Sequence, residues 1–321
     1  MATLITGGTG FIGAEMARIL LREGESDVTL FDIDDSRRRL DDIADKVKVV
    51  RGDVGNFSHV LDVVRESGAE VVFHMGSMLS VPSDADPQAA FRTNAMGTFH
   101  VLEACRLFGV RQLCFASSIG TYGDGIVGEQ IDDLTLQRPR LFYGACKLLG
   151  ENMGSFYRRK YGLDYRGLRY PPIVGPGVRS PGVTQYISWA IEESFKGRPF
   201  TIWVEPRTVA PGLYFKDAAR AMVMLSRAPA AAIETVNYLL AGADPTPSAG
   251  ELAQLVRDRV LGAEIDFVVD EATQAILDVI KPLDDGNARR EWGWSHAFGL
   301  EAMVEDFLAE LRDHPQRYDL S

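Results

Sequence analysis

The sequence of 321 residues contains only three cysteines and five histidines. Cys105, Cys114 and Cys146 form no CxxC pair and no other metal-binding spacing, so we expect buried thiols in a reducing compartment and no metal site. No apolar run reaches the roughly 18 residues that a membrane-spanning helix needs. The first residues show neither the basic segment nor the apolar stretch of a signal peptide, so the sequence predicts a cytoplasmic protein.

Positive charge is also scarce. The chain has 34 Lys and Arg residues against 45 Asp and Glu residues, which gives a net charge of −11. A surface of that charge repels phosphate backbones, so nucleic acids and anionic membranes are not expected partners. Apolar residues make up 46% of the chain, enough for a large core, and this excludes a wholly disordered protein.

Short β-branched segments alternate with helical periodicity over the first 170 residues. The expected strands are 3–6, 28–32, 47–50, 71–74, 112–116 and 164–170, and the expected helices are 11–23, 57–67, 86–108 and 144–160. Because strands that alternate with helices form parallel sheets covered on both faces, the pattern predicts an α/β fold with a Rossmann-like, doubly wound parallel sheet.

Turn-forming residues become frequent after Tyr170. The elements expected there are shorter: helices at 184–196, 216–227, 248–260 and 298–312 and a strand at 236–240. This change predicts a smaller, mostly C-terminal α/β lobe that is interleaved with the first domain. We assign 1–172 to the first domain, with 213–240 returning to it, and 173–212 and 241–321 to the second lobe.

A glycine-rich loop joins the first expected strand to the first helix. Gly7, Gly10 and Gly13 have the spacing GxxGxxG, which permits a tight turn and a close approach of the backbone to a pyrophosphate at the helix N-terminus. Asp32, at the end of the second strand, can bind a ribose 2′-hydroxyl and would repel a 2′-phosphate. An ordinary strand-to-helix turn is the alternative, but the context favours a dinucleotide-binding first domain. NAD is favoured, while arginines nearby leave NADP open.

Three residues form a pattern that is typical of hydride-transfer enzymes. Tyr143 and Lys147 lie four residues apart, which places them on one face of a helix. The lysine and an oxidised nicotinamide are both positively charged, so we expect them to lower the tyrosine pKa. Ser118, 25 residues before the tyrosine, can bind the same substrate oxygen. YxxxK alone also fits a core tyrosine beside a surface lysine, but the serine favours catalysis with Tyr143 as the base.

The residues at the end of the fourth expected strand could lie beside the cofactor. Met75 and Gly76 follow His74 there, and small residues at this point would let a cofactor approach. His74 itself is expected to be a packed structural histidine. Asp53, which follows the third strand, could lie beside an adenine or could cap a helix.

With these motifs the sequence resembles the extended short-chain dehydrogenase/reductase family, which includes NAD-dependent epimerases and dehydratases. The matching segments are TGGTGFIG (6–13), NAMGT (94–98), SSIGTYG (117–123), YGACK (143–147) and LRYPPIVGPG (168–177). The resemblance implies that Ser118, Tyr143 and Lys147 are catalytic. It also implies contacts with NAD from Gly7, Gly10, Phe11, Ile12, Asp32, Asp53, Val54, Asn94, Lys147 and Tyr170. Gly13, Met75, Gly76, Ser117 and Tyr143 complete the predicted cofactor site.

Within that family, other segments are similar to the short-chain L-threonine 3-dehydrogenases. These segments are 74–87, 207–221 and 284–303. The resemblance implies Ser80, Thr184 and Thr208, together with Ser118, as substrate contacts, and a helix cap or a loop hydroxyl is an equal alternative for the first three. The chain departs from that group at Gly76 and Ser77, where the group has two alanines, and it lacks a pair of methionines in the second segment.

We therefore predict an NAD-dependent oxidoreductase that takes a hydride from a secondary alcohol by a Ser-Tyr-Lys mechanism. The predicted substrate is L-threonine or a related small β-hydroxy acid, bound in the second lobe. A nucleotide-sugar 4-epimerase or dehydratase is the alternative, although Pro172 stands where such epimerases usually have asparagine. A non-catalytic dinucleotide sensor would not need the serine, tyrosine and lysine together.

Two of the expected helices contain more apolar residues than the side that faces the core accounts for. These are the helices near 87–108 and 144–160, and the residues are Phe91, Met96, Phe99, Met153 and Phe156. The family resemblance implies that these two helices pair across a two-fold axis into a four-helix bundle. We therefore predict a homodimer that forms through them.

Overall fold

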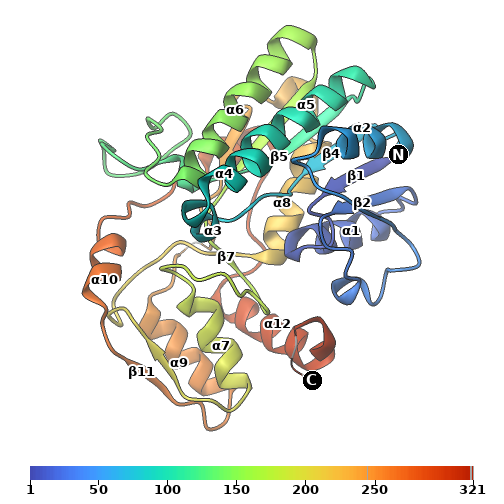
Figure 1. Cartoon of the computed structure of the whole chain (residues 1–321). Helices are drawn as coiled ribbons and strands as arrows, with labels where there is room; N and C mark the ends of the chain where they lie inside the picture. The colour runs from blue at the N-terminus through green and yellow to red at the C-terminus, as the bar shows by residue number, and fades with distance from the viewer. Residues whose placement is uncertain (244, 319, 321) are drawn as a thin grey trace. The chain divides into compact units, whose positions relative to one another are not determined.

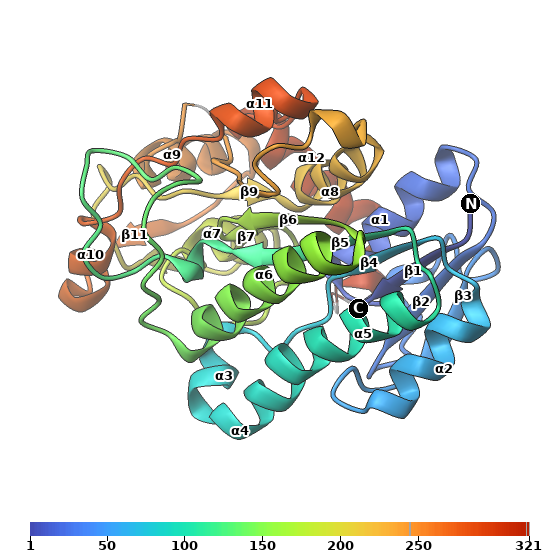
Figure 2. The same ribbon diagram turned by 90° about the horizontal axis from the view of Figure 1, so that it is seen from above.

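In this computed structural model, seven strands form a single parallel sheet in the order β10-β6-β5-β4-β1-β2-β3 (Figures 1 and 2). The strands are β1 (Thr3–Thr6), β2 (Val28–Asp32), β3 (Lys48–Arg51), β4 (Val71–His74), β5 (Gln112–Ser118), β6 (Asp164–Tyr170) and β10 (Asn237–Leu239). The chain order runs outward from β1 in one direction and from β4 in the other, so the switch point of a doubly wound sheet lies between these two strands. The predicted fold class is confirmed.

Helices cover both faces of this sheet (Figure 2). One face carries α2 (Phe57–Ser67), α5 (Gly97–Leu107) and α6 (Phe142–Tyr161), and the other carries α1 (Phe11–Arg22), α8 (Phe215–Arg227) and α11 (Gly286–Trp292). The core between α2, α5 and the sheet contains Val60, Val64, Val101, Leu102 and Phe115. Because both faces are covered, β1 and β4 are buried along their whole length.

The structure describes residues 1–243, 245–318 and 320, and it divides into two compact units. The larger unit comprises Met1–Tyr170, Ala218–Leu240 and Asp284–Trp294. The sequence analysis assigned the last of these segments to the C-terminal lobe. It belongs with the sheet because Glu291 of α11 accepts hydrogen bonds from the hydroxyls of Thr235 and Tyr238, next to and within β10. The functions assigned to the two domains stay predictions.

The smaller unit comprises Pro171–Asp217, Ala241–Leu283 and the chain from Ser295. Its helices α7 (Tyr186–Phe195), α9 (Ala249–Arg259) and α12 (Leu300–Asp313) pack against one another. This unit also contains α10 (Glu271–Leu277) and two parallel strand pairs, β8 (Phe200–Ile202) with β11 (Ile265–Phe267) and β7 (Ile173–Val174) with β9 (Leu213–Tyr214). The sequence analysis missed these four strands and α10 because segments of two to seven residues carry little periodicity.

The expected helix over 86–108 is interrupted. The structure has α4 (Pro87–Ala90), a π-helical segment at Phe91–Met96 and then α5, and a short helix α3 (Ser80–Ala85) precedes them. Single π-helical turns inside helices often occur at functional sites. Among the described residues, no helix combines the length and the apolar character that crossing a membrane requires.

Candidate functional site

The loop between β1 and α1 is shaped by its glycines. A Cβ atom at Gly13 would lie 2.4 Å from the Gly7 carbonyl oxygen, and one at Gly7 would lie 2.7 Å from the Gly76 amide nitrogen. Gly7 also has a φ of +67°, which disfavours any other residue. Gly10 is the N-cap of α1 and provides no side-chain cap. This backbone-lined helix N-terminus without a capping side chain fits the pyrophosphate of a dinucleotide.

The carboxylate of Asp32 is held beside this loop. It accepts hydrogen bonds from the amides of Thr9 (3.2 Å) and Asp34 (3.3 Å). Asp53 accepts from the Gly55 amide at 2.7 Å in the turn after β3, and Asn56 provides the cap of α2. Asp53 is therefore not the helix cap that the sequence left open.

Three other predicted cofactor contacts lie near the same end of the sheet. Phe11 and Ile12 begin α1 and are half-buried, and Val54 packs into the core between α2 and α5. The contacts of these residues and of Asp53 with a cofactor stay predictions.

Hydrogen bonds connect the end of β1 to the loop after β4. The Gly76 amide donates to Thr6 Oγ1 (3.1 Å), which lies 2.7 Å from His74 Nδ1. On the other side of the ring, Nε2 lies 3.1 Å from Thr98 Oγ1, whose proton is donated to the carbonyl of Asn94 (2.6 Å). Nε2 must therefore donate, and Nδ1 accepts from Thr6. Burial lowers the pKa of His74 to about 3, so the ring is neutral and has the structural role expected from the sequence.

Asn94 fixes the same loop from the π-helical segment. Its side-chain oxygen accepts from the Met78 amide (2.7 Å), and its side-chain nitrogen donates to the Met78 carbonyl (2.9 Å). The Met75 amide donates to the Thr6 carbonyl at 3.1 Å. The loop from Met75 to Met78 is thus held at both ends, while direct contact of Asn94 with a cofactor stays a prediction.

The structure brings together the three residues predicted to be catalytic. Ser118 ends β5, and Tyr143 lies in the first turn of α6. The two side chains meet at Gly120, where a Cβ atom would lie 3.3 Å from Ser118 Oγ and 3.5 Å from the Tyr143 ring. Lys147 follows one turn later. Its Nζ atom donates to the Ala116 carbonyl at 2.7 Å and lies 5.6 Å from the centre of the Tyr143 ring.

The electrostatics of this group differ from the sequence expectation. Burial raises the pKa of Tyr143 to about 12, although the nearby hydroxyl groups of Ser118 and Ser77 oppose this rise. Burial also lowers the pKa of Lys147 to about 7, against the influence of Cys146 and Glu151. The surrounding residues therefore favour the neutral phenol, and a phenolate requires additional positive charge.

A buried ion pair connects α6 to the sheet close to Lys147. Arg169 of β6 donates to Glu151 of α6, through Nε at 3.0 Å and through a terminal nitrogen at 2.7 Å. Ser117 also donates to Glu151, as does Gln137 at 3.1 Å. The Ser117 hydroxyl is thus engaged inside this network, and its predicted contact with a cofactor stays a prediction.

Sequence reasoning missed the glutamate and the arginine of this ion pair. Two signals could have revealed them. Glu151 lies four residues after Lys147, on the same face of the helix, and Arg169 is a charged residue within a strand expected to be buried. Arg169 also donates to the Tyr122 hydroxyl (2.9 Å) and the Asp133 carbonyl (3.0 Å), which holds the segment after β5.

The remaining predicted contacts divide between the two units. In the larger unit, Tyr170 donates from its hydroxyl to the Ala218 carbonyl (2.8 Å). Ser80 begins α3, and Asp84 of that helix accepts from the Phe142 amide at the start of α6 (3.0 Å).

In the smaller unit, Thr184 and Thr208 are buried, and Thr208 donates to Gln274 at 3.0 Å. Substrate contacts for Ser80, Thr184 and Thr208 stay predictions. Within residues 1–243, 245–318 and 320, no group of three or more His, Cys, Asp or Glu side chains could hold a metal ion.

Comparisons with known proteins identify related sequences and structures. The sequence model of the NAD dependent epimerase/dehydratase family matches residues 3–241. The mitochondrial L-threonine 3-dehydrogenase of Bos taurus is 33% identical over 308 residues, which cover 95% of this chain and 81% of that protein.

Solved structures of threonine dehydrogenases and of an epimerase are also similar to this chain. The holo form of a GalE-like L-threonine dehydrogenase from Cupriavidus necator has a TM-score of 0.84 at 29% identity and covers 97% of this chain and 100% of its own. A UDP-glucose 4-epimerase of Thermus thermophilus in complex with NAD has a TM-score of 0.81 at 26% identity. The match covers 97% of this chain and 99% of the epimerase chain.

A monomeric L-threonine 3-dehydrogenase from a metagenome database has a TM-score of 0.85 at 25% identity. The match covers 97% of this chain and 99% of that chain. These matches confirm the predicted family, the enzyme class and NAD as the cofactor.

Proposed function

This chain belongs to the NAD dependent epimerase/dehydratase family, and on that premise we propose that it oxidises a secondary alcohol of a small polar substrate. The substrate we propose is L-threonine or a related β-hydroxy acid. The observation that supports the proposal is that Ser118 and Tyr143 both lie against Gly120, with Lys147 one helical turn further on and its Nζ 5.6 Å from the centre of the Tyr143 ring. The similarity to named threonine dehydrogenases supports the substrate class.

The residues of the β1–α1 loop would hold the cofactor. The amides at the start of α1 would bind its pyrophosphate, and Asp32 would accept a hydrogen bond from its adenosine ribose. Lys147 would bind the nicotinamide ribose. When bound, NAD provides the hydride acceptor and, in its oxidised form, a positive charge.

The three proposed catalytic residues would orient the substrate and transfer its proton. Ser118 donates a hydrogen bond to the reacting oxygen of the substrate and orients it. The Tyr143 phenolate accepts the hydroxyl proton as the carbon loses its hydride, so the alcohol becomes a ketone and the phenol is restored. Because burial raises the pKa of Tyr143 to about 12, the base depends on the positive charge of Lys147 and of the oxidised cofactor.

A nucleotide-sugar 4-epimerase is the second candidate, since such an epimerase is among the structural neighbours. Two features of the sequence argue against it. Pro172 stands where these epimerases usually have an asparagine, and Pro211 and Gly212 lie where they usually have an arginine that binds the substrate phosphates. Both differences remove groups that a diphosphate substrate would need.

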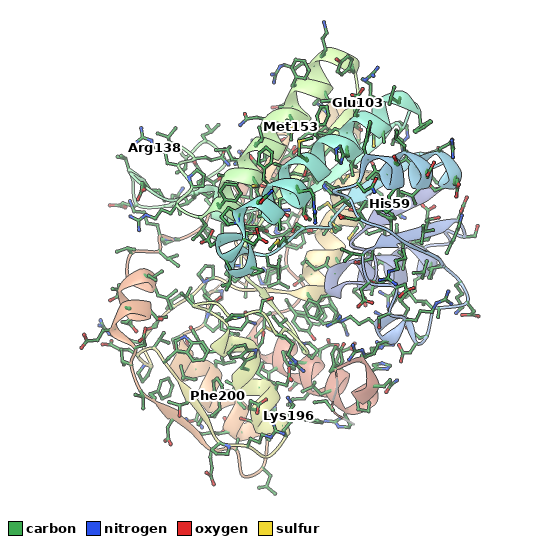
Figure 3. All side chains as sticks on the ribbon, viewed as in Figure 1. His59, Glu103, Arg138, Met153, Lys196 and Phe200 are labelled. Atoms are coloured by element: carbon green, nitrogen blue, oxygen red, sulfur yellow. The ribbon has the colours of Figure 1, made fainter. Side chains whose placement is uncertain are left out.

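We also propose a homodimer formed through α5, α6 and the π-helical segment. Phe91 and Phe156 are each 47% exposed on these elements, and Met96, Phe99 and Leu149 are also exposed. The two helices lie side by side, and Figure 3 labels Glu103 on α5 and Met153 on α6. Met153 packs against the core, so the exposed aromatic residues support the proposal and Met153 does not. Sedimentation at micromolar concentration tests it, and a monomer would contradict it. The cytoplasmic location stays a prediction.

The proposed reaction is tested by mixing the purified protein with NAD and L-threonine and following NADH absorbance. We expect steady NADH production, and we expect Tyr143→Phe to lower kcat by about 10²- to 10⁴-fold because it removes the base. Tyr238→Phe, which removes a hydroxyl bonded to Glu291, is the matched control and should retain activity.

Three other results would change the proposal. Turnover of a different β-hydroxy acid would correct the substrate. Inactivity with all such alcohols would contradict the dehydrogenase. Interconversion of a nucleotide sugar would favour the epimerase.

A further inference from the structure

Two side chains of α6 hold two consecutive residues of β5. Lys147 Nζ donates to the Ala116 carbonyl at 2.7 Å, and Glu151, one helical turn later, accepts a hydrogen bond from the Ser117 hydroxyl. The next residue of the strand is Ser118, which orients the substrate in the proposed reaction. That reaction gives Lys147 a role and gives none to Glu151, although Glu151 is a charged residue that is only 2% exposed.

Glu151 also binds the neighbouring strand. Arg169 of β6 is the register partner of Ser117, and its guanidinium donates to both oxygens of the Glu151 carboxylate. These bonds run from Nε at 3.0 and 3.1 Å and from a terminal nitrogen at 2.7 Å. One buried carboxylate therefore ties the carboxyl ends of β5 and β6 to α6. Moving either strand end away from α6 would leave a buried group without its partner, which is costly.

The same ion pair holds the segment 119–141, which joins β5 to α6. Near the start of the segment, the Tyr122 hydroxyl accepts from Arg169 at 2.9 Å. Near its end, Gln137 donates to Glu151 at 3.1 Å. The proposed catalytic serine directly precedes this segment and the proposed catalytic tyrosine closely follows it. Both therefore lie in stretches of chain that are attached to the ion pair.

We propose that Glu151 is a positioning residue for the proposed catalytic group: its carboxylate holds the ends of β5 and β6 against α6 and places a negative charge one helical turn from the Lys147 ammonium. Residues four apart in a helix are neighbours on its surface, so this charge also opposes loss of the lysine proton. The inference rests on the proposed function, because it assumes that Ser118, Tyr143 and Lys147 carry out the reaction. If the strand ends shift, the reacting groups lose their alignment, so the chemical step should slow while NAD binding changes little.

Steady-state kinetics of alcohol oxidation test this role with Glu151→Gln. We expect kcat to fall by about 10- to 100-fold with little change in KM for NAD. Asp164→Asn is the matched control, because it breaks the pair of Asp164 with the buried Arg166 (2.7 Å) at the opposite end of β6. This control should retain the wild-type kcat. Equal losses of kcat in the two variants would show only a general loss of structure and would overturn the proposal.

Ser117→Ala is a gentler variant, since it retains the ion pair and removes only the hydroxyl that bonds to Glu151. We expect kcat to fall by about 3- to 10-fold, again with little change in KM for NAD. Ser226→Ala on α8 removes a hydroxyl that donates to the Val223 carbonyl at 2.7 Å, and it should match the wild type. An unchanged kcat in Ser117→Ala, or a rise in KM for NAD alone, would overturn the positioning role.

A third measurement does not depend on turnover. With ¹³Cε-labelled lysine, the resonance of Lys147 is identified by its loss in Lys147→Met, and its titration is followed in the free protein. We expect the midpoint to fall by about 1 pH unit or more in Glu151→Gln and to stay in place in Asp164→Asn, because only the former removes the charge beside the lysine. Three other titratable groups near Lys147 are unchanged in both variants: Cys146, Tyr143 and His74.

The outcomes of this titration separate the two proposals. A midpoint that does not move in Glu151→Gln would overturn the role of Glu151 whatever the activity. A midpoint that falls in a protein that oxidises no alcohol would support the influence of Glu151 on Lys147 and overturn the proposed function instead.

Discussion

The two sides of the sheet's switch point are built by different means. On one side, the loop before α1 depends on backbone groups and on glycines that leave no room for a Cβ atom. On the other side, side chains make the contacts: Lys147 of α6 donates to the Ala116 carbonyl of β5, and Glu151 of α6 forms a buried ion pair with Arg169 of β6. The backbone site is encoded within a few consecutive residues, whereas the side-chain site is encoded by residues far apart in the chain. The two sides should therefore respond differently to mutation and to pH.

The largest effect is expected from breaking the ion pair on the catalytic side. Arg169→Met leaves the Glu151 carboxylate buried without its cation, so we expect the free energy of unfolding to fall by about 3–5 kcal/mol in urea denaturation. Adding Glu151→Gln removes the uncompensated charge and should recover part of the loss. Arg65→Met, which breaks the exposed pair with Asp62, is the control and should cost about 1 kcal/mol or less. Equal losses at the two sites would contradict the importance of the buried pair.

A smaller effect is expected from adding one methyl group to the β1–α1 loop. Gly13→Ala places a Cβ atom against the Gly7 carbonyl, so the loop must shift, at a cost of about 1–3 kcal/mol in unfolding free energy. The shifted amides should also weaken NAD binding by about 10-fold or more in a fluorescence titration. Gly299→Ala, where a Cβ atom would meet nothing within 4 Å, should change neither value. Normal NAD affinity in Gly13→Ala would show that this packing does not set the loop geometry.

The same contrast explains how much could be predicted from the sequence. The β1–α1 loop, Asp32 and the Ser118, Tyr143 and Lys147 group could be proposed from the sequence because each is marked by a short spacing next to a recognisable strand or helix, and their functions stay predictions. The ion pair of Glu151 with Arg169 was missed because it joins α6 to β6, and this tertiary pairing has no local sequence spacing.

For the chain's own residues the pKa of Tyr143 is raised, and the expected lowering by Lys147 together with an oxidised nicotinamide stays a prediction. The sequence indicated the nearby positive charge, but it could not give the extent of burial, which raises this pKa to about 12.

The smallest change in unfolding free energy, taken per pH unit, is expected for Lys147. This change distinguishes the two sides of the switch point by their response to pH. Burial lowers the pKa of this lysine to about 7, so above pH 7 the folded chain releases a proton that the unfolded chain keeps until about pH 10.5. The unfolded state then binds more protons, and wild-type stability should rise by about 1.4 kcal/mol per pH unit from this group between pH 7 and 10.5. Lys147→Met lacks this contribution, so its unfolding free energy relative to the wild type should fall by that amount per pH unit between about pH 7 and 9.

Urea denaturation at about pH 7, 8 and 9 measures this trend, with the exposed Lys160→Met as the control. The deficit of Gly13→Ala should stay constant over the same range, because its cause is steric. A constant difference for Lys147→Met as well would mean that the lysine keeps its proton to higher pH than its burial implies. The positive charge that Tyr143 would need as the proposed base would then be present without help from the cofactor, and the side of Tyr143 and Lys147 would be no more sensitive to pH than the β1–α1 loop.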